Sequence, residues 1–331
     1  MDSFVNRNPR VSVVMPAFNA AIYLAEAIES ILKQTYRDFE FIIINDGSTD
    51  LTSEIIKSYQ DLGPIRLIEF ETNRGLANAL NEGIYNACGE YIVRMDADDV
   101  AVKDRLQLQV EFMDSHPSIG ASGTLAQTMN SGLLNQVMSP NLLKAHLLLD
   151  NPLVHPTMIL RTSILQRNHF QYDGFVEDYR LWVKLSKVTL MAVLPEVLLY
   201  YRLSGNQFSV RCKPAQSEDA NLVRVSLFYE LLGRTLSENE RLIVSKEVLK
   251  KDLSYKSAVL FLNEIKRKNK TYSGPELDYV LNKLVKRNLY FCKLRLSDLR
   301  YVFGCSYLSV KEQIYIAKMV LEQTFGKRAV E

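Results

Sequence analysis

Four short apolar segments alternate with amphipathic segments along the first hundred residues of the chain. The apolar segments, which are rich in β-branched side chains, cover residues 11–15, 39–44, 65–68 and 91–93. Short runs of this kind are typical of buried parallel strands. The segments between them carry apolar residues at helical spacing, over residues 20–33, 51–56 and 75–87. This alternation predicts an α/β fold with a parallel sheet wound by helices.

Polar turns follow three of the predicted strands at the point where each strand ends. Their polar or turn-forming positions are Pro16, Ala17, Asn19, Asp46, Asp96, Ala97, Asp98 and Asp99. Ligands of wound sheets bind outside the carboxyl ends of the strands, so we expect these turns to converge on one edge. Carboxylates spaced like Asp96 and Asp98 can hold a divalent cation, and the cation can hold a diphosphate. The same spacing occurs in ordinary acidic loops, so the prediction of a cation site depends on the presence of the other two polar turns.

The pattern changes after residue 99. A helix is predicted over residues 102–115. Short apolar runs that predict strands of a mixed extension to the sheet lie near residues 119–125, 153–160, 190–194 and 197–201. From about residue 216 the spacing is helical almost throughout, with breaks expected at Gly233, Gly274 and Gly304. These changes predict two domains, over residues 1–214 and 215–331.

Composition indicates an ordinary globular protein, with 47% apolar and 24% charged residues. The four cysteines are scattered without metal-ligand spacing, which favours a reduced, cytoplasmic protein. Because the N-terminus is polar, we expect no signal peptide. The sequence has no run of about 18 apolar residues, so we expect no membrane-spanning helix.

The net charge of +2 hides a basic C-terminal region. Residues 241–331 contain 19 Lys and Arg against 9 Asp and Glu, so the rest of the chain is acidic. Two interpretations remain open: a helical tail with solvated basic faces, or attraction to an anionic membrane surface. Nucleic acid is disfavoured as a partner because no recognised binding motif accompanies the charge.

Several blocks of residues, in order along the chain, resemble family 2 glycosyltransferases. They are Pro-Ala-Phe-Asn at 16–19, Asn-Asp-Gly-Ser-Thr-Asp at 45–50, Asn-Arg-Gly-Leu-Ala at 73–77, Asp-Ala-Asp-Asp at 96–99, Glu-Asp-Tyr-Arg-Leu-Trp at 177–182 and Tyr-Arg at 201–202. The resemblance covers about residues 8–212. It implies a GT-A fold and an inverting transfer from a nucleotide-sugar, with a UDP-sugar as the expected donor. It also points to bacterial surface polysaccharides, such as lipopolysaccharide, O-antigen or capsule.

The resemblance implies roles for the nucleotide side of the site. Asp46 would accept a hydrogen bond from the uracil imide, although an Asx turn closed by Gly47 is the alternative. Pro16 and Ala17 would offer backbone groups to the base and ribose. Asn19 would either join them or cap a helix, and Arg74 would either approach the uracil and phosphates or simply start a helix.

The resemblance also implies how the diphosphate is held. Asp98 would ligate Mn²⁺ or Mg²⁺ directly, whereas Asp96, next to Ala97, would contact the ribose or approach the metal through water. Asp99 would orient this turn or cap the following helix. Arg202 would contact the phosphates, and the polar stretch at 204–209 could close over them.

On the acceptor side, Glu177 and Asp178 would head a helix beside the donor sugar. Asp178 is the preferred base for a single displacement, with Glu177 as the second candidate and acceptor ligand. The alternative is an acidic first turn that complements the helix dipole. Trp182 would stack on a sugar or pack in the core, and His155 is more often a structural residue than a catalyst.

Other functions remain to be weighed. A nucleotidyltransferase would carry a glycine-rich basic loop after the first strand, and a processive synthase would carry Gln-x-x-Arg-Trp and membrane spans; neither is found. We therefore expect transfer of one hexosyl or N-acetylhexosaminyl unit to a glycan or lipid-linked glycan. The basic residues 215–331 would associate with the inner face of the cytoplasmic membrane, with the acceptor, or with a second copy in a homodimer.

Overall fold

The computed structural model describes residues 8–130, 132–203, 211–245, 255–289, 298–303 and 308–325. The polar stretch at 204–209 and the break expected at Gly304 lie outside these residues. The chain forms two compact units. One contains Met1–Leu143 and Pro152–Lys213, and the other contains Lys144–Asn151 and Pro214–Glu331. The short segment 144–151 was not separated from its neighbours by the sequence pattern.

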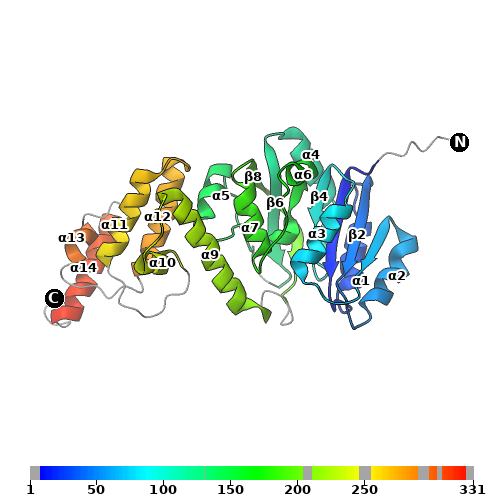
Figure 1. Cartoon of the computed structure of the whole chain (residues 1–331), viewed down its shortest axis with the longest axis horizontal. Coiled ribbons are helices and arrows are strands. Elements are labelled where there is room, and N and C mark those ends of the chain that lie inside the picture. Colours follow the sequence, from blue (N-terminus) through cyan, green and yellow to red (C-terminus); the bar gives the residue numbers. More distant parts are fainter. Residues whose placement is uncertain are drawn as a thin grey trace. The chain divides into compact units, whose positions relative to one another are not determined.

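The first unit is built on an eight-stranded sheet with the order β3-β2-β1-β4-β7-β6-β8-β5. Its first four strands are β3 (Ile65–Glu69), β2 (Phe39–Asn45), β1 (Val11–Ala17) and β4 (Tyr91–Arg94). They are mutually parallel and lie side by side in Figure 1. The predicted wound sheet is therefore confirmed, and the carboxyl ends of these strands share one edge.

Helices cover both faces of these strands. Val13 and Met15 of β1 join one apolar cluster with Ile28 of α1 (Leu24–Leu32). Val14 points to the other face, towards α3 (Leu76–Asn86). There a Cβ on Gly83 would lie 2.3 Å from a methyl carbon of Val14, so the absence of a side chain allows α3 to pack closely. β1, β2 and β4 are buried on both faces, which explains their continuous apolar runs, whereas the residues of β3 are partly or fully exposed.

The first, second and fourth helices begin later than predicted, with α1 starting at Leu24 rather than at residue 20. α2 is Thr52–Tyr59, and Asp50 accepts the backbone N–H of Thr52 from two residues before it. α4 is Arg105–Ser115 rather than 102–115, because Val100–Ala101 forms the short edge strand β5. This strand pairs with β8, and Val102 N–H continues the pairing by donating to Leu198.

The extension of the sheet is mixed, as predicted, but its strands differ in detail. β6 is Ile119–Thr128, and the run at 153–160 yields a 3₁₀ turn, η2 (His155–Thr157), before the short β7 (Ile159–Arg161). The two runs predicted near 190 and 199 form one strand, β8 (Leu190–Tyr201). Thr124 pairs with Leu194 and Leu125 with Val197, so Pro195 and its neighbour sit in a bulge. A bulge accommodates a proline without breaking the strand.

The second unit is helical over its described residues (Figure 1). Its helices are α9 (Lys213–Leu232), α10 (Glu238–Val244), α11 (Tyr255–Lys268), α12 (Gly274–Leu289), α13 (Leu299–Phe303) and α14 (Val310–Phe325). As predicted, α9 ends before Gly233, and Gly274 marks the start of α12. In the described ranges no helix is both long enough and apolar enough to span a membrane.

Candidate active site

Asp46 connects two loops at the carboxyl edge of the sheet. It follows β2 and is 3% exposed. Its carboxylate accepts the backbone N–H of Arg74 at 2.7 Å and of Gly75 at 2.9 Å, and the side-chain amide of Asn73 at 3.0 Å. Burial raises the pKa of Asp46, and the two backbone hydrogen bonds partly oppose this rise. The carboxylate therefore reaches the neighbouring loop instead of closing a local Asx turn, and its nucleotide role stays a prediction.

Gly47 gives a direct test of this contact between loops. Its φ is +67°, and an added Cβ would lie 2.4 Å from the carbonyl carbon of Thr72 and 2.5 Å from the nitrogen of Asn73. Because both obstacles are backbone atoms, Gly47→Ala should lower the free energy of unfolding by about 1–3 kcal/mol. Chemical denaturation of this variant checks the result. Gly274→Ala is the control, since nothing lies within 4 Å of its added Cβ, and an equal loss in both variants would contradict the interpretation.

Asn19 links the first turn to the second. Its φ is +48°, its side-chain oxygen accepts the N–H of Thr49 at 2.8 Å, and its own N–H donates to the hydroxyl of Ser48 at 3.0 Å. The capping alternative is excluded, because α1 begins at Leu24. Asn19 therefore braces the nucleotide-side loops.

Pro16 and Ala17 are the last two residues of β1, at the predicted edge. The pairing of β1 with β4 stops two residues before Pro16, so the missing N–H breaks no bond to that strand. The carbonyl of Ala17 accepts the N–H of Asp46 at 2.8 Å. The first two turns are thus bonded to each other directly.

Arg74 lies at the start of α3, with its guanidinium 4.3 Å from the centre of the Phe70 ring. This cation–π contact orients the side chain. Arg74 also lines a cavity of about 460 Å³, together with the first turn of α3 and residues 172–175. The cavity brings the nucleotide-side loop against the segment that leads to Glu177.

Asp96, Asp98 and Asp99 form an acidic cluster after β4. Each offers one carboxylate oxygen, and these oxygens lie within 4.8 Å of one another, which suits a single divalent cation. Asp99 is fully buried, one of its oxygens accepts the N–H of Arg202 at 2.9 Å, and the other has no hydrogen-bond partner. Burial, then the charge of Asp96, raises the pKa of Asp99 to about 8. An unsatisfied buried oxygen in a group of acids fits a cation site, with Ala97 buried between the ligands.

Asp99 orients the acidic turn, which is the first of the two roles predicted for it. The capping alternative is excluded, since α4 begins only at Arg105. Arg202 braces the turn further, because its Nε donates to the carbonyl of Asp98 at 2.9 Å and its guanidinium lies over the Tyr23 ring at 4.2 Å. Its Nη2 also contacts Glu26 at 2.5 Å. The predicted phosphate contact of Arg202 stays a prediction.

Two buried arginines beneath the acidic turn were missed by the sequence reasoning. Arg94, the last residue of β4, is 3% exposed and forms an ion pair with Asp96. Arg105 is fully buried and donates to the carbonyl of Arg94 at 2.8 Å and to Gln109 at 3.0 Å. A signal for Arg94 was present, because an arginine interrupts the apolar run of 91–95 immediately before the acids. A charge is rarely buried without a partner.

Glu177 and Asp178 head α7 (Glu177–Leu185), as expected. Glu177 is 5% exposed, and its carboxylate lies 3.5 Å from Nδ1 of His155, whereas Asp178 is more exposed. Nε2 of His155 lies 3.0 Å from the hydroxyl of Tyr172. Burial, and then the charge of Arg94, lowers the pKa of His155 to about 3, so its ring is neutral near pH 7. His155 is therefore a structural residue behind Glu177.

Trp182 belongs to the core. It is fully buried and meets the His155 ring edge-on, with 5.7 Å between the ring centres. A sugar could not stack on a side chain without exposed surface, so the packing alternative is correct.

The sequence comparisons agree with the geometry. The glycosyl transferase family 2 model matches residues 12–167. An uncharacterized glycosyltransferase of Haemophilus influenzae is 33% identical over 234 residues, which cover 65% of this chain and 72% of that protein. The chain belongs to glycosyltransferase family 2. EpsE of Bacillus subtilis, itself a candidate glycosyltransferase, is 32% identical over 232 residues, or 66% of this chain and 82% of EpsE. This chain is 30% identical over 272 residues to a longer uncharacterized glycosyltransferase of Rickettsia felis, and the match spans 44% of that protein.

Solved structures confirm the GT-A fold of this glycosyltransferase. S. aureus TarS, solved as residues 1–349 in complex with UDP-GlcNAc, has a TM-score of 0.57 at 19% identity, covering 97% of this chain and 90% of that one. The mannosyltransferase PcManGT of Pyrobaculum calidifontis, solved with GDP-Man and Mn²⁺, has a TM-score of 0.53 at 17% identity, covering 97% and 89%. At such identity the likeness concerns the fold.

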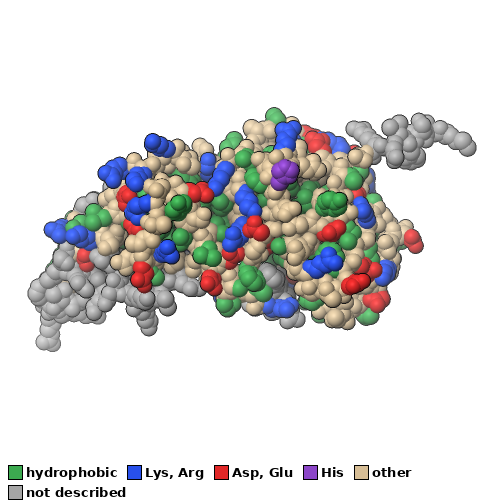
Figure 2. All heavy atoms as spheres, in the orientation of Figure 1, with side chains coloured by type: hydrophobic (Ala, Val, Ile, Leu, Met, Phe, Trp, Pro, Cys, Tyr) green, Lys and Arg blue, Asp and Glu red, His purple; other side chains and the backbone are tan. Residues whose placement is uncertain are grey.

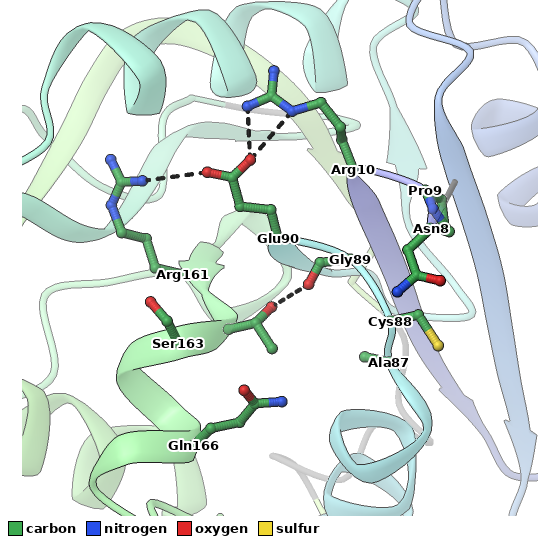
Figure 3. Close-up of a pocket in the computed structure, with 11 residues that line it drawn as sticks. Asn8, Pro9, Arg10, Ala87, Cys88, Gly89, Glu90, Arg161, Ser163 and Gln166 are labelled. Atoms are coloured by element: carbon green, nitrogen blue, oxygen red, sulfur yellow. Dashed lines mark hydrogen bonds and ion pairs between the residues drawn. The ribbon is translucent and has the colours of Figure 1, made fainter. Parts of the chain in front are cut away.

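A second cavity of the glycosyltransferase lies at the opposite edge of the sheet (Figure 3). It also measures about 460 Å³ and is lined by Arg10 and Glu90, which precede β1 and β4, and by Arg161. The guanidinium of Arg10 contacts Glu90 at 2.9 Å and Asp114 at 2.8 Å. The charged side chains that line this cavity are thus paired with one another or with Asp114. The cavity lies at the opposite end of the strands from the acidic cluster. The carboxyl edge of the sheet, which carries the acidic cluster, is therefore the better candidate for the active site.

Proposed function

We propose that this enzyme transfers one sugar from a UDP-sugar to a hydroxyl of a glycan or lipid-linked glycan, with inversion at the anomeric carbon. The observation that carries the proposal is the pairing of the acidic cluster with the carboxylates of α7. Arg94 connects the two groups, because it forms an ion pair with Asp96 and its backbone N–H donates to the carbonyl of Met158. Met158 follows the 3₁₀ turn that holds His155 next to Glu177. One group can hold a leaving diphosphate while the other accepts the proton of an attacking hydroxyl.

The acidic cluster would hold the leaving group. Asp98, with Asp96 as its second ligand, would bind Mn²⁺ or Mg²⁺. Such a cation would stabilise the negative charge of the leaving diphosphate. Arg74 and Arg202 lie on the same edge and would add positive charge there. Weak cation binding without nucleotide is expected, since the diphosphate supplies further oxygen ligands.

Asp178 would act as the base. The acceptor oxygen forms the new bond to the anomeric carbon as its proton passes to the carboxylate of Asp178. Its exposure relative to the buried Glu177 supports this choice. Glu177, fixed against His155, would instead contact substrate hydroxyls.

UDP is the proposed nucleotide because of the position of Asp46 and the family pattern around it. The solved neighbours bind different donors, UDP-GlcNAc in TarS and GDP-Man in PcManGT, so the fold alone does not select the base. A hydrolysis screen with Mn²⁺ should show turnover of at least one UDP-hexose or UDP-N-acetylhexosamine at about tenfold or more the rate of GDP-mannose. Preference for GDP-mannose would overturn the assignment to UDP.

The acceptor and the cellular location are proposed from the family resemblance and from the positive charge of the C-terminal region. Lipid-linked acceptors of lipopolysaccharide, O-antigen or capsule assembly would place the enzyme at the inner face of the cytoplasmic membrane. Figure 2 shows Lys and Arg among Asp and Glu on the visible face of the helical unit. Several basic residues of this unit are paired with acids, since Lys266 contacts Asp278 at 2.8 Å and Lys286 contacts Glu312 at 2.7 Å. Pairing reduces the charge available for a membrane, so any attraction should be weak and sensitive to salt.

Vesicle binding tests the membrane proposal. Arg267 and Lys270 are exposed around the end of α11. Their joint reversal, Arg267→Glu with Lys270→Glu, should weaken sedimentation with anionic vesicles by about tenfold, since each base near the surface contributes about 1 kcal/mol. Neutral vesicles are the control. Equal binding of both proteins to anionic vesicles would count against a membrane role for this region.

A further inference from the structure

The segment that leads into α7 contains one buried residue. Residues 170–176 form neither helix nor strand, and all of them are at least partly exposed except Tyr172, which is 5% exposed. The backbone groups of a buried residue need hydrogen-bond partners, and a segment outside helices and sheets must find them elsewhere. For Tyr172 the partner is a side chain of α3, 91 residues earlier along the chain.

Asn81 of α3 supplies both partners. Its amide nitrogen donates to the carbonyl of Tyr172 at 2.9 Å, and its amide oxygen accepts the backbone N–H of the same residue at 2.8 Å. A side-chain amide offers a donor and an acceptor side by side. An acid or an apolar side chain of the same shape would therefore satisfy only one of these two backbone groups, or neither. Asn81 thus holds the segment before α7 against α3.

α3 is a firm support for this contact. Gly83 lies two residues after Asn81, and a Cβ there would lie 2.3 Å from a methyl carbon of Val14, so the helix rests directly on β1. The N-terminal end of α3 is bonded to the nucleotide-side loop, because the N–H of Gly75 donates to the carboxylate of Asp46. The position of the segment before α7 is therefore referred to the sheet and to that loop.

The side chain of Tyr172 continues the contact to the head of α7. Its hydroxyl lies 3.0 Å from Nε2 of His155, and Nδ1 of the same ring lies 3.5 Å from the carboxylate of Glu177. All three side chains are buried. In a close-packed interior a displacement of Tyr172 would be passed on to these neighbours. Asp178 is the next residue of α7 after Glu177.

We propose that Asn81 is a positioning residue for sugar transfer. It fixes the separation of the two walls of the cavity between the start of α3 and residues 172–175, and through Tyr172 and His155 it sets where α7 presents its two carboxylates. The inference rests on the proposed function. Displacement reactions depend steeply on the alignment of the reacting groups, so loss of this contact should affect the rate of transfer. Nucleotide affinity should change little, because Asp46 and Arg74 keep their own hydrogen bond.

The experiment compares full-length variants with Mn²⁺ and the UDP-sugar that the donor screen finds to turn over fastest. Asn81→Ala should lower the single-turnover rate by about tenfold or more, while calorimetric affinity for UDP stays within about threefold of wild type. Amide hydrogen exchange over residues 170–178 should become faster, because the N–H of Tyr172 loses its acceptor. Asn81→Asp keeps an acceptor but turns a carboxylate towards the carbonyl of Tyr172, so it should be impaired in the same direction.

Asn86→Ala is the matched control. Asn86 is the last residue of α3, its amide nitrogen donates to Glu82 at 2.8 Å and its amide oxygen accepts from Arg66 at 2.7 Å. This variant also loses the hydrogen bonds of an asparagine on α3, but at the end of the helix far from Arg74. It should keep the wild-type rate and the wild-type exchange over residues 170–178.

The other outcomes each decide against the inference. A wild-type rate in Asn81→Ala would overturn it, as would an equal loss of rate in Asn86→Ala, which would indicate a general effect on stability. A loss of UDP affinity as large as the loss of rate would place the effect in the nucleotide loop instead.

Two further measurements keep the test decisive. If Asn81→Ala does not fold, Asn81→Asp and Tyr172→Phe decide, and wild-type rates in both would overturn the inference. If wild type turns over no UDP-sugar, the proposed donor fails, and hydrogen exchange then decides the structural contact by itself. Unchanged exchange over residues 170–178 in Asn81→Ala would overturn the inference in either case.

Discussion

Asp178→Asn should reduce sugar transfer by about 10²–10⁴-fold with little change in stability. The amide has nearly the same shape as the carboxylate but cannot take a proton from the acceptor hydroxyl. Asp178 is in the first turn of α7 and is more exposed than Glu177, so the exchange leaves the core intact. Binding of UDP with Mn²⁺ should stay within about threefold of wild type, because the nucleotide is held at the other side of the site.

Rates from single-turnover assays, with thermal unfolding measured on the same samples, check this expectation. Asp61→Asn is the control, since Asp61 is an exposed acid in the turn after α2. Near-normal transfer by Asp178→Asn would remove Asp178 from the role of base. A large loss in Glu177→Gln at the same time would then favour Glu177.

Asp98→Asn should lower transfer by about 10²–10³-fold for a different reason. The variant keeps the shape of the acidic turn but removes a charged oxygen ligand, so the cation that stabilises the leaving diphosphate binds poorly. The loss should be partly relieved by raising the Mn²⁺ concentration, and UDP affinity should fall together with activity. This dependence on Mn²⁺ separates Asp98→Asn from Asp178→Asn, whose defect no concentration of cation should relieve.

Calorimetry of UDP binding at several Mn²⁺ concentrations makes the measurement. The matched control is Asp104→Asn, an acid before α4 that forms no capping hydrogen bond through its side chain. Wild-type activity and an unchanged response to Mn²⁺ in Asp98→Asn would show that the cluster does not ligate the cation.

Periodicity predicted the parallel half of the sheet well, for a physical reason. β1, β2 and β4 are covered on both faces, so almost every side chain is apolar and the runs are unmistakable. β8 was read as two strands because Pro195 interrupts it, and a bulge is decided by pairing with β6 rather than by local sequence. Residues 144–151 join the helical unit through tertiary packing, which leaves no local signal.

The candidate site was predicted in outline but not in its supports. The acids and the order of the turns were visible, because they stand at strand ends. Tyr172 and His155 approach each other from a loop and a 3₁₀ turn that are 17 residues apart, and no spacing rule connects them. Asp46 was expected to face a nucleotide, yet its hydrogen bonds to the loop of Arg74 became visible only in three dimensions.

The bonds of Asp46 to the loop of Arg74, and of Asn19 to Thr49, have a consequence for how donor preference can change. These hydrogen bonds hold the backbone around the proposed nucleotide site within the protein itself, so binding of a nucleotide there would restrict little additional motion. The same hydrogen bonds make the loops unable to adapt their course to a larger or smaller base. A relative with another nucleobase preference should therefore differ in the side chains along this edge, on a backbone that is nearly the same.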